Sequence, residues 1–175
     1  MLHKALTSFV AETYWDDPDF LLVDLPPGTG DVSLSVAQLL PRAALLVVTT
    51  PQLAAQRVAR RAAMMAHRVD LPVIGVLENM SGFVAPDTGH RYDVFGAGGG
   101  AQLAKDLGRP LIGQIPLEPS VAEAGDAGTP VVAGETESPA AEALKAASDR
   151  LLEELAVMAH AEGNGALQHT SADSG

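Results

Sequence analysis

The alternation of apolar and polar positions along the chain predicts strands and helices in turn. Apolar, partly β-branched runs at 20–24, 43–49, 72–77 and 111–115 are short and end at breakers, as buried parallel strands do. Apolar residues recur at helical spacing around these runs, which predicts helices over 2–13, 31–40, 52–68, 100–107 and 139–158. Because parallel neighbours need right-handed crossovers, we expect an α/β fold, a parallel doubly wound sheet with helices on both faces.

The pattern changes in two places. Residues 82–95 form short extended pieces around a Pro-Asp-Thr-Gly sequence, which predicts a hairpin inserted into the alternation. From 159 to 175 the residues are small and polar without periodicity, which predicts a disordered tail. We therefore expect one domain over residues 1–158 that carries one insertion.

Composition narrows the function classes. The chain has 175 residues, of which 47% are hydrophobic, enough for one respectable core. A net charge of −11 disfavours binding to nucleic acid or to anionic membranes. Neither a membrane-length apolar run nor a cleavable leader is recognisable, so we expect a cytoplasmic protein. Since the chain has no cysteine, it supplies no disulfide, thiol nucleophile or thiolate ligand for zinc or an iron–sulfur cluster.

Polar or proline-containing loops follow three of the predicted strands, at Asp24, Asn79 and Pro116. The carboxyl ends of parallel strands share one edge of the sheet, where ligands bind, so we expect these loops to converge. The Asp24 carboxylate can hold a hydrated Mg²⁺ against nucleotide phosphates, and the N–H of Gly28 can approach the terminal phosphate. The alternative for Asp24 is a strand-end residue that caps the next turn.

Five segments, in this order and spacing, resemble the Mrp/ApbC family of P-loop ATPases, whose relatives include MinD and the nitrogenase iron protein. They are VDLPPGTGD at 23–31, TTPQ at 49–52, ENMS at 78–81, FGAGGG at 95–100 and IPLEPSVAEAGDAGTP at 115–130. The resemblance covers residues 1 to about 155. It implies a MinD-like P-loop NTPase fold, binding of ATP and Mg²⁺, ATP hydrolysis in the full-length form, and an iron–sulfur cluster carrier that acts as a homodimer with client proteins.

The resemblance assigns the phosphate side of the nucleotide site. Asp24 matches the Walker B aspartate, which holds Mg²⁺ through water. Pro26, Pro27 and Gly28 match the switch that senses the γ-phosphate. Asp24 and Gly28 are therefore the expected catalytic residues.

The resemblance also assigns the base side. The side-chain amide of Asn79 would hydrogen-bond the adenine edge, since an amide can donate and accept at once. Pro116 and Leu117, with the backbone of Glu118, would wall the base. A structural amide that caps the next turn is the alternative for Asn79.

The chain departs from the family in lacking a Walker A loop. Its only lysines, Lys4, Lys105 and Lys145, follow no glycine-rich loop. The run at 96–100 lacks the lysine that reaches the β- and γ-phosphates, and it is interpreted as a flexible start of a helix. We therefore expect a C-terminal portion, either a fragment or the product of a wrongly assigned start, that is inactive alone.

A second departure lies in the insertion. The family carries a C-x-x-C there, whereas this chain has Ala85 and Thr88, and neither side chain can ligate iron. Asp87, His90 and Asp93 could bind a hard or borderline metal, against which stands a simple solvated hairpin.

Two other functions are compatible with the pattern. One is a non-catalytic regulatory or partner module that binds a complementary P-loop chain. The other is a MinD-like positioning ATPase, although such proteins end in a basic amphipathic membrane helix, and the last helix here is acidic.

Overall fold

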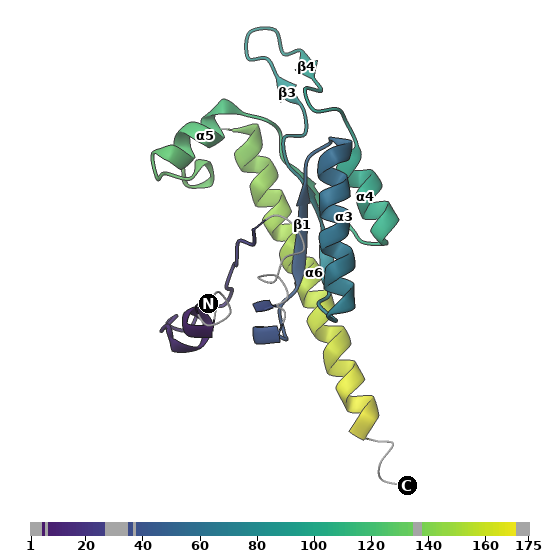
Figure 1. Cartoon of the computed structure of the whole chain (residues 1–175). Helices are drawn as coiled ribbons and strands as arrows, with labels where there is room; N and C mark the ends of the chain where they lie inside the picture. Colours follow the sequence, from purple (N-terminus) through teal and green to yellow (C-terminus); the bar gives the residue numbers. More distant parts are fainter. Residues whose placement is uncertain (1–4, 6, 27–34, 37, 135–137, 171–175) are drawn as a thin grey trace.

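The structure, a computed structural model, describes residues 5, 7–26, 35, 36, 38–134 and 138–170, with side chains as far as residue 160 (Figure 1). The elements, in chain order, are η1 (Ser8–Glu12), β1 (Leu45–Thr49), α3 (Leu53–Arg68), β2 (Val73–Glu78), β3 (Phe83–Val84), β4 (Arg91–Tyr92), α4 (Gly99–Leu107), β5 (Leu111–Gln114), α5 (Pro119–Asp126), η2 (Val131–Ala133) and α6 (Pro139–Thr170). None of these described helices combines the length and the apolar character that a membrane span needs.

The main sheet is parallel, in the order β1-β2-β5. Its strands form where three of the predicted apolar runs lie, shifted by no more than two residues. β2 is central and almost wholly buried, because helices cover both of its faces. The α/β class predicted from the sequence is confirmed.

Helices pack on both faces of this sheet (Figure 1). On one face, α3 and α4 cover β1 and β2 around Val76 and Leu103, which are fully buried. On the other face, α6 packs against β5 around Ile112 and Ala147. Gly113 makes this second contact close, since a Cβ there would lie 2.9 Å from the Cβ of Ala147.

The predicted strand at 20–24 does not form. Residues 20–26 adopt no regular element, and Phe20 and Leu22 are 60% and 87% exposed. β1 pairs with β2 along one edge, and among the described residues no strand lies along its other edge. An apolar run becomes a strand only where it pairs with a neighbour, and residues 20–24 do not pair with the free edge of β1.

The insertion is a hairpin, as predicted. β3 and β4 pair antiparallel, with Phe83 opposite Tyr92 and Val84 opposite Arg91. The turn is closed by the N–H of Ala85, which donates to the carbonyl of His90 at 2.9 Å. Figure 1 shows the hairpin standing out beyond the carboxyl edge of the main sheet.

α6 starts at the predicted place and ends later than predicted. The N–H of Ala141 donates to the hydroxyl of Ser138 at 3.1 Å, so the serine caps the helix ahead of Pro139. The helix then continues to Thr170, past the predicted limit at 158, and its end projects away from the sheet. Alanine, leucine and glutamate are frequent near that limit, and they favour helix without tertiary contacts.

Candidate functional site

Backbone hydrogen bonds join the carboxyl ends of the three parallel strands into one continuous edge. The N–H of Asn79 donates to the carbonyl of Thr49 at 2.7 Å, and the N–H of Ile115 donates to that of Glu78 at 2.8 Å. The N–H of Ser81 donates to the carbonyl of Ile115 at 2.8 Å. Asn79 and Pro116, which follows Ile115, therefore lie on the same edge, as predicted.

Asp24 is not brought to this edge by any strand. It is exposed within the irregular segment, and its carboxylate makes no hydrogen bond to a described residue. Pro26 is also exposed, while Pro27 and Gly28 lie outside the described residues. The predicted convergence thus holds for two of the three loops, because Asp24 depended on the strand that does not form.

Asn79 closes a turn. Its side-chain oxygen accepts the N–H of Met80 at 2.8 Å, and Met80 has a φ of 57°. The amide nitrogen makes no hydrogen bond to a described residue, and the side chain is exposed. The amide can therefore close this turn and still offer two N–H groups and a second oxygen lone pair to a ligand.

The predicted base wall contacts the insertion. Pro116 and Leu117 are half-buried, and the N–H of Leu117 donates to the carbonyl of Gly82 at 2.8 Å. Leu117 also forms an isolated parallel bridge with Phe83. Backbone contacts thus join the predicted base wall directly to the hairpin.

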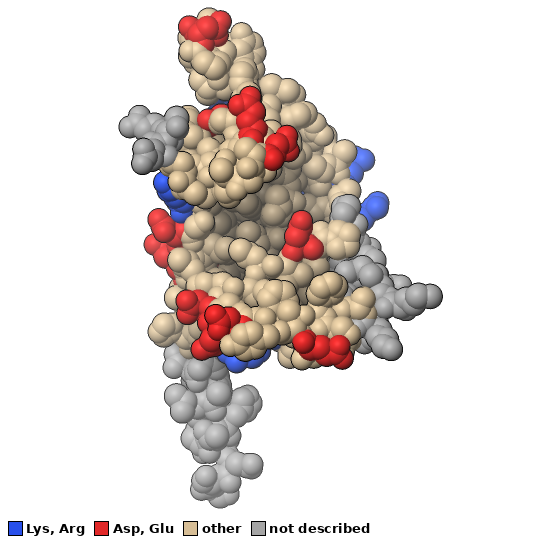
Figure 2. Space-filling view, turned by 90° about the vertical axis from the view of Figure 1, so that its left-hand side faces the viewer, with Lys and Arg blue, Asp and Glu red and all other residues tan. Residues whose placement is uncertain are grey.

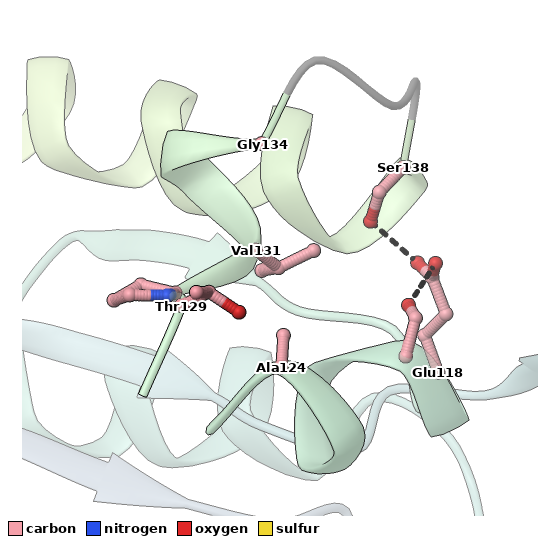
Figure 3. Close-up of a pocket in the computed structure, with 8 residues that line it drawn as sticks. Glu118, Ala124, Thr129, Val131, Gly134 and Ser138 are labelled. Carbon is pink, nitrogen blue, oxygen red and sulfur yellow. Dashed lines mark hydrogen bonds between the residues drawn. The ribbon is translucent and has the colours of Figure 1, made fainter. Parts of the chain in front are cut away.

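The Glu118 side chain points toward Ser138 at the start of α6 (Figure 3). Its carboxylate accepts the hydroxyls of Ser120 and Ser138 and the N–H of Ala140, the last two at 2.9 Å. A cavity of about 270 Å³ lies beside it, between α5, η2 and α6. Burial raises the pKa of Glu118, but these hydrogen bonds outweigh burial and lower the pKa overall. Ionised Glu118 therefore stabilises the folded state at pH values above the ordinary carboxyl pKa. This stabilisation is lost as the pH falls through the lowered pKa of Glu118 in the folded state.

Sequence reasoning missed Glu78, which is fully buried at the end of β2. One carboxylate oxygen accepts the hydroxyl of Ser81 and the amide of Gln114, both at 2.7 Å, and the other accepts the N–H of Gly100. The available signal was an acid at the last position of an apolar strand, with a serine three residues later. A buried carboxylate persists only where donors surround it, and here they come from three different segments.

The glycine run at the start of α4 is more than a flexible start. A Cβ at Gly99 would collide with the carbonyl of Pro51 and the side chain of Gln56. A Cβ at Gly100 would lie 2.6 Å from the Cβ of Glu78. α4 begins within this run, as predicted, and the glycines also let its first turn approach the ends of β1 and β2.

The hairpin holds no thiolate at the two family positions. Ala85 is buried beside the turn and Thr88 is exposed at its tip. His90 packs edge-on against Tyr92 at 4.6 Å between ring centroids, and Asp93 pairs with Arg91 at 3.0 Å. Within the described part of the chain, no three histidine or acidic side chains are grouped so that they could hold a metal ion.

The side of the molecule on which α5 lies in Figure 1 is acidic. Figure 2 shows Asp and Glu side chains spread around a hollowed middle, with Lys and Arg only at the margins of this face. The distribution agrees with the net charge of −11. Among the described residues, this face offers no basic patch of the kind that a nucleic-acid backbone requires.

Comparison with known proteins decides the family. Residues 1–152 match the ParA family, described as the NUBPL iron-transfer P-loop NTPase. This chain belongs to that family. Iron–sulfur cluster carrier proteins of Mycobacterium leprae and Deinococcus radiodurans are 52% and 46% identical to it, each over 157 residues. These alignments cover 86% and 90% of this chain but 41% and 44% of the relatives, so the chain spans less than half of their length.

Solved structures of similar proteins confirm the P-loop NTPase fold. A nucleotide-binding protein from Archaeoglobus fulgidus, in complex with ADP, has a TM-score of 0.67 and 33% identity over 79% of this chain and 56% of its own. The MinD cell division protein of Aquifex aeolicus has a TM-score of 0.62 over 87% of this chain and 59% of its own. Its identity of 24% supports the fold alone. The resemblance drawn from the sequence motifs is confirmed.

Proposed function

We propose that this chain is the magnesium- and base-binding part of an iron–sulfur cluster carrier that hydrolyses ATP. The observation that carries the proposal is the 52% identity to an iron–sulfur cluster carrier over 86% of this chain. The shared edge of Asn79 and Pro116 supports it, as does the similarity to the Archaeoglobus protein, which was solved in complex with ADP.

On the phosphate side, Asp24 holds Mg²⁺ through water, and Pro26, Pro27 and Gly28 form the switch. The exposed Asp24 carboxylate makes no hydrogen bond to a described residue, so it is available to a hydrated cation. Bound magnesium would neutralise the charge that develops on the γ-phosphate when water attacks.

On the base side, the Asn79 amide nitrogen donates to the adenine edge while its oxygen keeps the bond to Met80. Pro116 and Leu117, with the backbone of Glu118, lie against the base. The Glu118 side chain is engaged by α6, so its part is confined to the backbone. Adenine is thereby recognised by one directional amide and an apolar wall.

The cluster does not fit the residues of this chain. Iron–sulfur clusters are held by thiolates, and the two family positions are Ala85 and Thr88 in a chain without cysteine. We therefore propose that this chain ligates no cluster itself and contributes the nucleotide side of a homodimeric, cytoplasmic carrier that acts on client proteins.

A second candidate is a non-catalytic module that completes a separate P-loop chain. The observation in its favour is that Lys4, Lys105 and Lys145 follow no glycine-rich loop, so this chain has no phosphate-gripping lysine of its own. Positioning in the manner of MinD is less favoured, because the MinD likeness rests on 24% identity.

A hybrid tests the catalytic proposal. In it, this chain replaces the matching region of the Mycobacterium leprae carrier, which supplies the rest of the protein. We expect Mg²⁺-dependent ATP turnover, which Asp24→Ala should reduce about tenfold or more because the metal loses its carboxylate partner. Release of inorganic phosphate measures the effect.

Asp19→Ala is the matched control, since Asp19 is an exposed carboxylate of the same irregular segment. Its turnover should equal that of the parent hybrid. Equal losses in both variants, or no loss in either, would remove Asp24 from the metal site. A hybrid that binds ATP but never hydrolyses it would favour the non-catalytic module.

Two substitutions of Asn79 separate base recognition from turn closure. In the hybrid, Asn79→Ala should weaken ATP binding by about 1–3 kcal/mol and narrow the preference for ATP over GTP. Asn79→Asp keeps an oxygen for the Met80 N–H but removes both amide donors. It should lose ATP affinity as well, while the melting temperature of the nucleotide-free protein stays close to the parent value.

Calorimetric titration and thermal melting measure the two properties side by side. If Asn79→Asp binds ATP like the parent while Asn79→Ala melts earlier, the amide serves the turn alone. The adenine assignment would then be wrong.

A further inference from the structure

One carboxylate binds the chain on both sides of the insertion hairpin, residues 82–95. Ser81 directly precedes the hairpin, and its hydroxyl donates to Glu78 Oε1 at 2.7 Å. Gly100 follows the hairpin in the first turn of α4, and its N–H donates to Glu78 Oε2. The two feet of the hairpin thus meet at a side chain that has no exposed surface.

The first foot is tied further by the hairpin itself. The guanidinium of Arg91 donates to the carbonyl of Ser81 at 3.2 Å and to the carboxylate of Asp93 at 3.0 Å. It also lies over Gly82, where a Cβ would come within 2.6 Å of its central carbon. Gly82 has a φ of 77°, which glycine adopts without strain. Arg91 thereby fixes β4 against Ser81 and Gly82, and Ser81 is itself hydrogen-bonded to Glu78.

The same foot touches the base wall. Leu117 donates its N–H to the carbonyl of Gly82 and bridges Phe83, the first residue of β3. Gln114, at the end of β5, donates to Glu78 Oε1 at 2.7 Å. The carboxyl edge of the sheet and the base of the hairpin are therefore one hydrogen-bonded unit centred on Glu78.

We infer that Glu78 is a positioning residue that clamps both feet of the insertion hairpin and holds it as a rigid arm on the strand ends that carry Asn79 and Leu117. A displacement of those strand ends then moves the hairpin tip, because a rigid arm transmits motion that a loose loop absorbs. The link to ATP rests on the proposed function, whereas the rigidity of the arm belongs to this chain without nucleotide.

Spin labels can test the arm directly, since a chain without cysteine accepts labels only where thiols are introduced. Asp87→Cys marks the exposed hairpin tip and Arg61→Cys the exposed side of α3. Pulsed electron–electron double resonance on the full 175-residue chain, without nucleotide, then gives the distribution of distances between the label at the hairpin tip and the label on α3. We expect a single narrow distribution in this labelled parent.

Glu78→Gln keeps the size of the side chain but removes its charge and one of its two acceptor oxygens. The distance distribution should broaden by about half or more, because the two feet no longer share one charged acceptor. Ser81→Ala frees the first foot alone and should broaden the distribution less. Exchange of the Leu117 amide proton should accelerate in both, whereas that of Ala85, inside the hairpin, should change little.

Ser138→Ala is the matched control for lost stability. It removes a buried hydroxyl that caps α6 and belongs to another hydrogen-bond network, so it should lower the melting temperature. The tip distribution should stay narrow in this variant, which separates loosening of the arm from general destabilisation.

An unchanged distribution in a folded Glu78→Gln protein would overturn the inference, as would equal broadening in Ser138→Ala. If Glu78→Gln fails to fold, Ser81→Ala decides alone, and a parent-like distribution there overturns the inference. None of these measurements uses ATP, so failure of the arm and failure of the ATPase proposal are distinguishable.

Discussion

Titration of the 175-residue chain with Mg·ATP should give a dissociation constant roughly 1,000-fold weaker than that of the hybrid with the Mycobacterium relative, a difference of about 4 kcal/mol. Most phosphate affinity in P-loop proteins comes from the N–H groups of the glycine-rich loop and its lysine. This chain offers neither, since Lys105 and Lys145 lie on α4 and α6 rather than after such a loop. Isothermal titration calorimetry measures both constants.

Asp24→Ala in the isolated chain is the control for residual metal-assisted binding. Its affinity should be as weak as that of the parent chain, because the missing contacts dominate. A micromolar constant for the unmodified chain would contradict the prediction. Such affinity would mean that a phosphate site exists without the loop.

Anaerobic reconstitution of the chain with iron and sulfide should leave no stoichiometric iron after desalting, since no thiolate is present. In the hybrid, Ala85→Cys with Thr88→Cys should create a site that retains iron and absorbs in the visible range. Ala85 lies directly before the hairpin turn and Thr88 lies within it, and the N–H of Gly89 donates to the carbonyl of Ala85 at 2.8 Å. Iron analysis and absorption spectra measure the gain.

The matched control shifts the same spacing by one residue. Val84→Cys with Asp87→Cys supplies two thiols on the same hairpin, both at exposed positions. It should retain much less iron, because these positions do not match the family's pair. Equal retention in both double variants would show that any two thiols suffice and that the alignment of this hairpin carries no information.

Local sequence predicted the elements whose formation depends on their own residues or on near neighbours. β1, β2 and β5 follow from apolar runs ended by breakers, and the hairpin follows from its turn residues. Ser138 before Pro139 marks the start of α6. The serine hydroxyl accepts a free N–H of the first helical turn, and proline has no N–H that would need a partner there. The motif order alone indicated the family that the comparisons confirm.

Contacts between distant segments decided the rest. The run at 20–24 is as apolar as a buried strand, yet it stays irregular, because strand pairing depends on which segment lies beside it and not on its own residues alone. Gly99 and Gly100 are needed because Pro51 and Glu78 lie too close to leave room for a Cβ. Neither the missing strand partner nor this close contact can be recognised from the neighbouring residues in the sequence.

Glu78 shows most directly the difference between what local sequence predicts and what tertiary contacts decide. By sequence it is an acid at the end of an apolar strand, and solvent exposure is the ordinary expectation for an acidic side chain. In the fold it is fully buried, because Ser81, Gly100 and Gln114 arrive from three segments to donate to it. Sequence determined that this chain builds a parallel sheet with polar and proline-containing loops at its carboxyl edge. Only the tertiary structure decided which polar groups meet there, since a hydrogen bond depends on distances that the order of residues does not contain.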